Sequence, residues 1–145
     1  MNWQKEAIND LRAYASRVRA LENMKERISL LESKYKTVRS AMGDTDAVKG
    51  GGSKQEELLI NNIAERERLK LNMRATAELV KLTRKGLDNL TERQIQILNS
   101  FYIEHYPGHV ERLCEEFHVE QSRIYQLKDE ALYKFTIGMY GIIDF

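Results

Sequence analysis

The stretch VERLCEEFHVEQSRIYQLKDEALYKF, residues 110–135, decides the fold of the C-terminal part of this 145-residue chain. Its apolar residues recur at helical spacing in two runs, and a short polar segment around His118 separates the runs. The small Cys114 lets a second helix cross closely, and Val119 closes the corner after the turn. We therefore predict a helix-turn-helix, with a short helix over 110–117 and a longer helix over 121–137. The predicted inner faces comprise Val110, Leu113, Cys114 and Phe117, then Ile124, Leu127, Ala131, Leu132 and Phe135.

A third short helix is predicted just before this motif. Thr91 and Gln94 fit a T-x-x-Q capping box, in which two side chains and two backbone amides at a helix start satisfy one another. Ile95, Leu98 and Tyr102 then give the helix an apolar face, and a loop at 105–108 ends it.

The outward positions of the longer predicted helix carry side chains suited to DNA. Glutamine and serine hydrogen-bond base edges, whereas arginine and lysine bind phosphates. Tyr125 can contact a base or fold back over the core, and the polar positions can also be a plain solvated face. The predicted base-contacting residues are Gln121, Ser122, Tyr125 and Gln126. The predicted phosphate-contacting residues are Arg112, Arg123, Lys128 and Lys134.

These residues, with LTERQIQIL at 90–98, resemble region four of bacterial primary sigma factors, which binds the promoter −35 element. That family usually has glycine in the turn and serine at the helix start, where this chain has His118 and Glu120. Histidine tolerates the left-handed backbone better than most residues, but glutamate is a poorer N-cap than serine. Gln126 agrees with the family at a base-contacting position, and the neighbouring positions differ. The resemblance therefore does not imply the consensus −35 element as the target.

The whole chain is similar to the ArpU/RinA-like late-transcription regulators of phages and prophages of Gram-positive bacteria, and residues 90–145 carry this resemblance. It implies an activator or repressor that binds upstream double-stranded DNA and acts at promoters, with contact to RNA polymerase, in the cytoplasm of the bacterial host. No counterpart of sigma region two is found in the sequence, so promoter melting by this chain alone is not expected.

The N-terminal part predicts a long helix over residues 3–42. Its apolar positions recur with a mean spacing of 3.5 residues, which is the seam of a coiled coil. A helix of about 40 residues spans about 60 Å and cannot bury such a seam on itself. The predicted seam comprises Tyr14, Val18, Leu21, Met24, Ile28, Leu31, Tyr35, Val38 and Met42.

A glycine-rich linker at 43–55 and a second long helix follow. Ser53 and Glu56 fit a capping box at its start, Arg66 is a polar break in its seam, and Gly86 stands where a helix-ending residue belongs. The predicted seam comprises Leu59, Ile63, Leu69, Met73, Thr76, Val80, Thr83 and Leu87.

These patterns predict an all-α protein with two domains, a helical hairpin at 1–89 and a helix-turn-helix domain at 90–145. The two long helices can pack on each other, or their seams can also join a second subunit, and we expect a homodimer through them. The apolar tail at 135–145 can extend the last helix over the small core. Alternatively, it can contact the N-terminal helices or another subunit.

The charge is divided unevenly along the chain. Residues 1–89 hold 18 Lys and Arg against 13 Asp and Glu, and residues 90–145 hold 5 against 9, so their net charges are +5 and −4. Because DNA-binding domains are usually basic, we expect the C-terminal part to depend on a second copy, the basic helices or polymerase.

Several functional classes are disfavoured. No nucleophile with a neighbouring base is found, and the GGGS stretch lacks the lysine of a phosphate loop, so neither an enzyme nor a cofactor is expected. A metal site is not expected either, because the chain has one cysteine and its candidate ligands fill other roles. The sequence has no run of about 18 apolar residues, so no membrane span is expected, and no targeting segment is recognised. The candidate ligands considered were His105, His109, Cys114 and His118.

Two other functions remain open at this stage. Small terminase subunits, which package phage DNA, also combine helix-turn-helix and coiled-coil parts but form rings of many chains. A helical adaptor that binds RNA polymerase and never DNA would explain the negative C-terminal charge.

Overall fold

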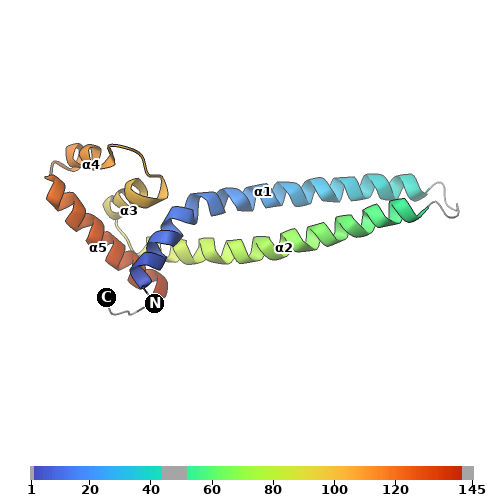
Figure 1. Ribbon diagram of the computed structural model, residues 1–145, viewed down its shortest axis with the longest axis horizontal. Coiled ribbons are helices and arrows are strands. Elements are labelled where there is room, and N and C mark those ends of the chain that lie inside the picture. Colours follow the sequence, from blue (N-terminus) through green and yellow to red (C-terminus); the bar gives the residue numbers. More distant parts are fainter. Residues whose placement is uncertain (1, 44–51, 142–145) are drawn as a thin grey trace. The chain divides into compact units, whose positions relative to one another are not determined.

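The computed structural model describes residues 2–43 and 52–141, and within these ranges the regular structure is helical throughout, which confirms the all-α prediction. The chain forms two compact units: a head unit, Met1–Val18 with Glu78–Phe145, and a hairpin unit, Arg19–Ala77. The elements, labelled in Figure 1, are α1 (Trp3–Gly43), α2 (Gly52–Asp88), α3 (Glu92–Leu98), η1 (Asn99–Ile103), α4 (His109–Phe117) and α5 (Gln121–Tyr140).

The predicted seam of α1 is confirmed in the hairpin unit. Between residues 21 and 42, the residues of α1 that are not exposed are the seven predicted seam positions in that range. The seam faces an antiparallel α2: Arg27 pairs with Glu65 at 3.0 Å, and the Leu31 carbonyl accepts a 2.8 Å hydrogen bond from Asn62. Of the described residues of this unit, Leu31 and Leu59 are the ones that are buried, at 4% and 7% exposure.

The predicted seam of α2 is wrong at Ile63, which is 43% exposed. Asn62 and Arg66 lie toward α1 instead, and together with Leu59 and Leu69 they keep alternate steps of three and four residues. These polar side chains are satisfied there, because Arg66 donates to Asn62 at 2.8 Å and its guanidinium lies 4.9 Å from the Tyr35 ring centroid. A polar layer therefore interrupts the apolar seam.

The long helices extend further than predicted. α1 continues to Gly43, and α2 already begins at Gly52, so Ser53 lies inside α2 and is not its N-cap. The rest of the predicted linker, residues 44–51, lies outside the described residues. Gly86 does not end α2 either, because the helix continues to Asp88.

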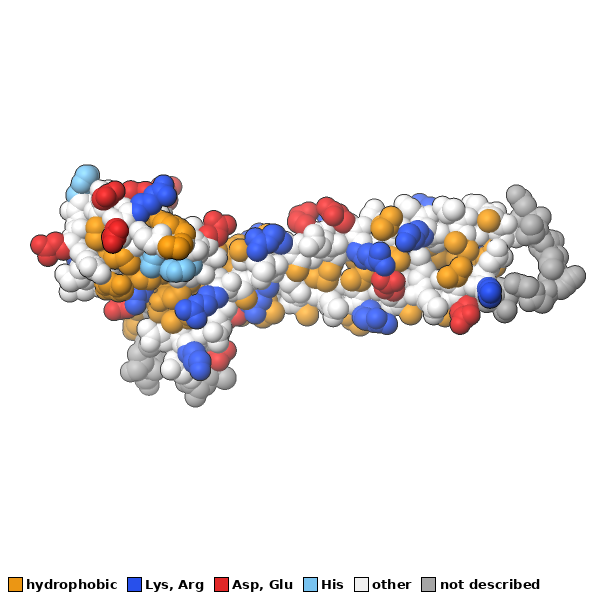
Figure 2. Space-filling view, turned by 45° about the horizontal axis from the view of Figure 1, so that its top comes forward, with side chains coloured by type: hydrophobic (Ala, Val, Ile, Leu, Met, Phe, Trp, Pro, Cys, Tyr) orange, Lys and Arg blue, Asp and Glu red, His pale blue; other side chains and the backbone are white. Residues whose placement is uncertain are grey.

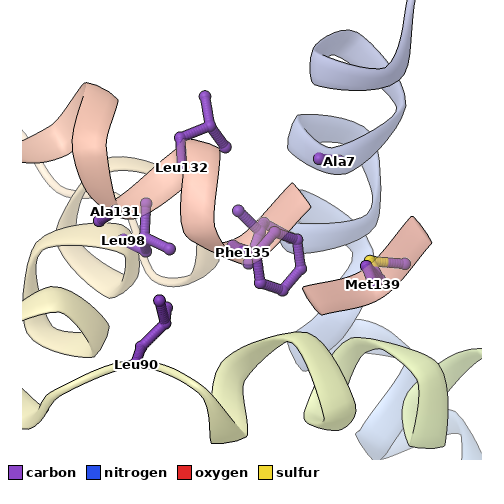
Figure 3. Packing of buried hydrophobic residues seen from close by; sticks show 8 residues of the cluster. Ala7, Leu90, Leu98, Ala131, Leu132, Phe135 and Met139 are labelled. Atoms are coloured by element: carbon purple, nitrogen blue, oxygen red, sulfur yellow. The ribbon is translucent and has the colours of Figure 1, made fainter. Parts of the chain in front are cut away.

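The head unit has a core to which the first part of α1 and the last part of α2 contribute. Ala7 and Leu11 of α1 are fully buried and belong to the same cluster as Phe135 of α5. Figure 3 shows Ala7 and Phe135 in this cluster. The sequence analysis placed a boundary at 89/90, whereas the compact unit also takes in residues 1–18 and 78–89. The remaining buried members of this core cluster are Leu90, Leu98, Ala131, Leu132 and Met139.

Gly86 and Gly138 let α2 and α5 cross at close range. A Cβ on Gly86 would lie 2.7 Å from Cε2 of Phe135 and 3.1 Å from its carbonyl oxygen. A Cβ on Gly138 would lie 2.7 Å from Nδ2 of Asn89 and 3.3 Å from the Cα of Gly86. Gly86 therefore lies inside a helix because the close packing leaves no room for a side chain, and not because the helix ends there.

The tail extends the last helix and also contacts the N-terminal helix. α5 continues to Tyr140, whose ring lies 4.9 Å from that of Trp3. The Tyr140 hydroxyl donates a 2.6 Å hydrogen bond to Asp10, which also pairs with Arg17 at 2.9 Å. Burial and the Asp10 carboxylate together raise the pKa of Tyr140. Residues 142–145, which include the apolar Ile142, lie outside the described residues.

The helix before the helix-turn-helix begins as predicted but changes form midway. Both capping-box hydrogen bonds are present, from the Gln94 amide to the Thr91 hydroxyl at 3.2 Å and from the Thr91 amide to the Gln94 side chain at 3.0 Å. After Leu98 the chain forms η1, a π-helix closed by a 2.8 Å bond from the Glu104 amide to the Asn99 carbonyl. The sequence analysis did not anticipate this turn.

Gly86→Ala should destabilise the protein, although alanine favours helices, because the added methyl group overlaps Phe135. We expect a loss of about 1–3 kcal/mol in the free energy of unfolding, measured by urea denaturation. Lys85→Ala, at the exposed neighbouring position, is the control. An unchanged or raised stability of Gly86→Ala would contradict the close crossing.

Leu11→Ala should destabilise the head unit, although Leu11 lies far in the sequence from residues 90–145, which make up most of that unit. Removing a fully buried leucine costs about 2–5 kcal/mol. Leu30→Ala, at a position that is 48% exposed, should change stability by less than about 0.5 kcal/mol. Equal effects of the two substitutions on urea denaturation would show that α1 does not belong to this core.

Candidate nucleic-acid interface

The turn between α4 and α5 has the predicted backbone. His118 adopts the left-handed conformation, with φ 54° and ψ 46°, and the Val119 amide donates to the Cys114 carbonyl at 3.3 Å. Glu120 makes no side-chain capping bond, as expected of a poor N-cap, but its carbonyl accepts the amides of Arg123 and Ile124. α4 begins at His109, one residue earlier than predicted, and α5 begins at Gln121 as predicted.

The helix-turn-helix stands on its own small core. Ile97 of α3 joins Leu113, Phe117 and Ile124 to form a buried cluster. Cys114 and Val119 pack against this cluster, so they lie where the sequence analysis expected a small residue and a corner plug. The other half-buried members are Phe101, Val110 and Leu127.

The predicted base-contacting side chains lie together on the first two turns of α5. Gln121, Ser122 and Gln126 are exposed, and Tyr125 is 42% exposed. The Gln126 side chain accepts a 3.3 Å hydrogen bond from Arg123. These four side chains therefore form a polar and aromatic surface, the α5 contact surface, above the buried Ile124.

Carboxylates accompany the predicted phosphate-binding residues. Arg123 lies 3.8 Å from Glu130, and Arg112 lies 3.6 Å from Glu116. Lys134 is exposed on a shallow groove of about 410 Å³, which is also lined by Gln94, Asp129, Glu130 and Tyr133. On the face shown in Figure 2, acidic and basic side chains alternate over α4 and its neighbours, without a continuous basic area.

Lys128 is the least exposed of the four predicted phosphate-contacting residues. Its side chain is 19% exposed and lies 2.7 Å from Asp129. Burial alone would lower the pKa of Lys128, but the hydrogen bond that its ammonium donates to Asp129 and its interactions with Tyr102 outweigh burial and raise the pKa. The ammonium also lies 5.7 Å from the Phe101 ring centroid and 5.8 Å from that of Tyr125. Lys128 is thus charged but held in place.

An aromatic cluster adjoins the α5 contact surface and was missed by the sequence analysis. The Phe101 ring contacts His109 at 4.5 Å and Tyr125 at 5.8 Å, both edge to face. His105 lies 4.5 Å from His109, and burial followed by the His105 charge lowers the pKa of His109. The one available signal is the FYI sequence at 101–103, of which only Tyr102 is named on the predicted apolar face of the helix.

The described residues hold no group of three or more His, Cys, Asp or Glu side chains placed to bind a metal ion. His109 and His105 contact each other, whereas Cys114 packs in the core and His118 forms the turn. Over the same part of the chain, no helix has the length and apolar composition needed to cross a bilayer.

No protein-family model, curated protein or solved structure matches this chain.

His118→Gly should stabilise the protein by about 0.5–1 kcal/mol, because a residue with a Cβ is strained in the left-handed conformation and glycine is not. His118→Val should destabilise it, since a β-branched residue fits that conformation worst. Urea denaturation of both variants tests the turn. The opposite order of stabilities would contradict the left-handed backbone at this position.

Proposed function

We propose that this protein is a sequence-specific DNA-binding regulator of transcription, which acts at promoters without catalysis and inserts α5 into the major groove. The observation that carries the proposal is the α5 contact surface on a helix-turn-helix with a closed core. The first turns of the second helix contact base edges in this type of motif.

The residues divide into two roles under this proposal. Gln121, Ser122, Tyr125 and Gln126 contact bases, since amides, hydroxyls and aromatic rings suit the donors, acceptors and methyl groups of the major groove. Arg112, Arg123 and Lys134 are the phosphate contacts, and the two arginines exchange their carboxylate partners for phosphates on binding. Lys128 contributes its charge from a fixed position.

Because the C-terminal part is acidic, its affinity for DNA needs a contribution from other parts of the protein. Its net charge of −4 opposes DNA, whereas residues 1–89 carry +5. We therefore propose that a homodimer presents two heads to two half-sites, with the basic helices adding salt-sensitive phosphate attraction. The hairpin unit supports self-association, because Leu58, Ile60 and Leu71 are each at least 58% exposed.

On the basis of the resemblance to the ArpU/RinA-like regulators and to sigma region four, we propose that the protein acts in the cytoplasm of a bacterium carrying a phage or prophage. Under that proposal, RNA polymerase is a second partner. A polymerase-binding adaptor that never touches DNA is the second candidate function, and the carboxylates beside Arg112 and Arg123 favour it.

Selection of enriched sequences from random duplexes at low salt tests DNA binding. We expect one enriched motif, and Gln121→Ala or Gln126→Ala should weaken binding to it by about 1–3 kcal/mol. Gln55→Ala, at an exposed position of α2, is the control and should leave affinity unchanged. If no sequence is enriched and Gln126→Ala changes nothing, the adaptor function replaces this proposal.

Light scattering of the full chain tests the assembly. We expect twice the 17.0 kDa chain mass. A mass of about eight chains or more would instead support a small terminase ring and would contradict a dimeric regulator.

A further inference from the structure

The π-turn η1 places one aromatic ring beneath the α5 contact surface. Phe101 is the middle residue of Asn99–Ile103, which is closed by the 2.8 Å bond between Glu104 and Asn99. π-turns are rare and are found frequently at functional sites. The ring is half-buried against the core under the helix-turn-helix, so its position is set by packing.

Phe101 contacts both helices of the motif. Its ring meets His109, the first residue of α4, at 4.5 Å with an interplanar angle of 88°. It meets Tyr125 of α5 at 5.8 Å with an angle of 73°. Both arrangements are edge to face, which is a favoured geometry for aromatic pairs.

Tyr125 therefore has two neighbours that restrain its ring although it is 42% exposed. The Phe101 ring is one neighbour of the Tyr125 ring. The other is the Lys128 ammonium, which lies 5.8 Å from the Tyr125 ring centroid. Lys128 is fixed in turn by Asp129 at 2.7 Å. An exposed tyrosine ordinarily samples several rotamers, whereas an edge-to-face pair favours one arrangement by roughly two- to tenfold.

We propose that Phe101 is a positioning residue that sets the base preference of α5 through Tyr125. The proposal rests on the DNA-binding function proposed above. Tyr125 presents an ordered ring, which suits contact with the 5-methyl group of thymine in the major groove. Phe101 acts on this contact without touching DNA, because it determines where the Tyr125 ring lies before DNA arrives.

The test compares base preferences in the full-length protein. Phe101→Met keeps an apolar side chain that fills the core but removes the ring, and Phe101→Leu is a second ringless variant. Phe117→Met and Phe117→Leu are matched controls, because Phe117 lies in the same core and has no ring contact with Tyr125 among those of the described residues. Phe101→Tyr retains a ring. Each variant and Tyr125→Ala is selected against random duplexes at a temperature well below its unfolding midpoint.

We expect the ringless Phe101 variants to lose roughly two- to tenfold discrimination at the base pairs where Tyr125→Ala also loses it. Combining Phe101→Met with Tyr125→Ala should cause no further loss, and Phe101→Tyr should restore the preference. The Phe117 variants should lower affinity without changing the preferred sequence.

The proposal is overturned if the ringless Phe101 variants keep the full base preference, or if they change it at base pairs that Tyr125→Ala leaves unaffected. It is also overturned if Tyr125→Ala changes no preference. In each of these cases the unaltered protein still enriches a sequence, so the DNA-binding function stands. Failure of the unaltered protein to enrich any sequence instead contradicts the DNA-binding function itself.

Discussion

The close crossing of α2 and α5 is the constraint on which the head unit depends. Gly86 and Gly138 bring the two backbones close together. Phe135 of α5 then packs against α2 and against the N-terminal part of α1. Phe135 is fully buried and shares its cluster with Ala7 and Leu11. α5 is thereby anchored at its C-terminal half, while its N-terminal half carries the exposed polar side chains. One helix thus links the core of the head unit to the proposed contact with DNA.

Local patterns predicted the elements of this fold well. The 3.5-residue spacing identified the α1 seam because that pattern is set by a neighbouring helix of any sequence. His118 was expected to adopt a left-handed backbone, and it does so because a three-residue turn between packed helices requires it. The inner faces of α4 and α5 followed from apolar spacing alone, since burial of those faces drives the motif to form.

Several features that local patterns do not indicate depend on partners distant in sequence. Asn62 replaces Ile63 in the α2 seam because the Leu31 carbonyl accepts its hydrogen bond. Gly86 has the local signature of a helix end, but it serves a crossing with residues fifty positions away, at Phe135 and Gly138. In the sequence, Lys128 has the pattern of a mobile phosphate-binding residue, whereas in the structure its ammonium lies near the ring of Phe101. Sequence spacing cannot show such contacts, because each needs the tertiary fold to be known.

Under the proposed function, the electrostatics of the head limit how it could bind DNA. Arginines on α4 and α5 already have carboxylate neighbours, so DNA must compete with Glu116 and Glu130 for them. Surface ion pairs of this kind are weak and screened by salt, and phosphates can therefore displace them at modest cost. In the proposed function, sequence preference would depend on the uncharged side chains at 121–126, and overall affinity would depend on the number of heads and on the basic helices.

The most direct test of DNA contact through α5 is amide NMR of the isotopically labelled full chain, titrated with a duplex that the protein enriches. The account predicts that the largest shift changes fall on the amides of residues 121–126, with smaller changes at Arg112 and Lys134. Changes confined to the basic long helices, or the absence of changes on α5 at saturating duplex, would contradict it.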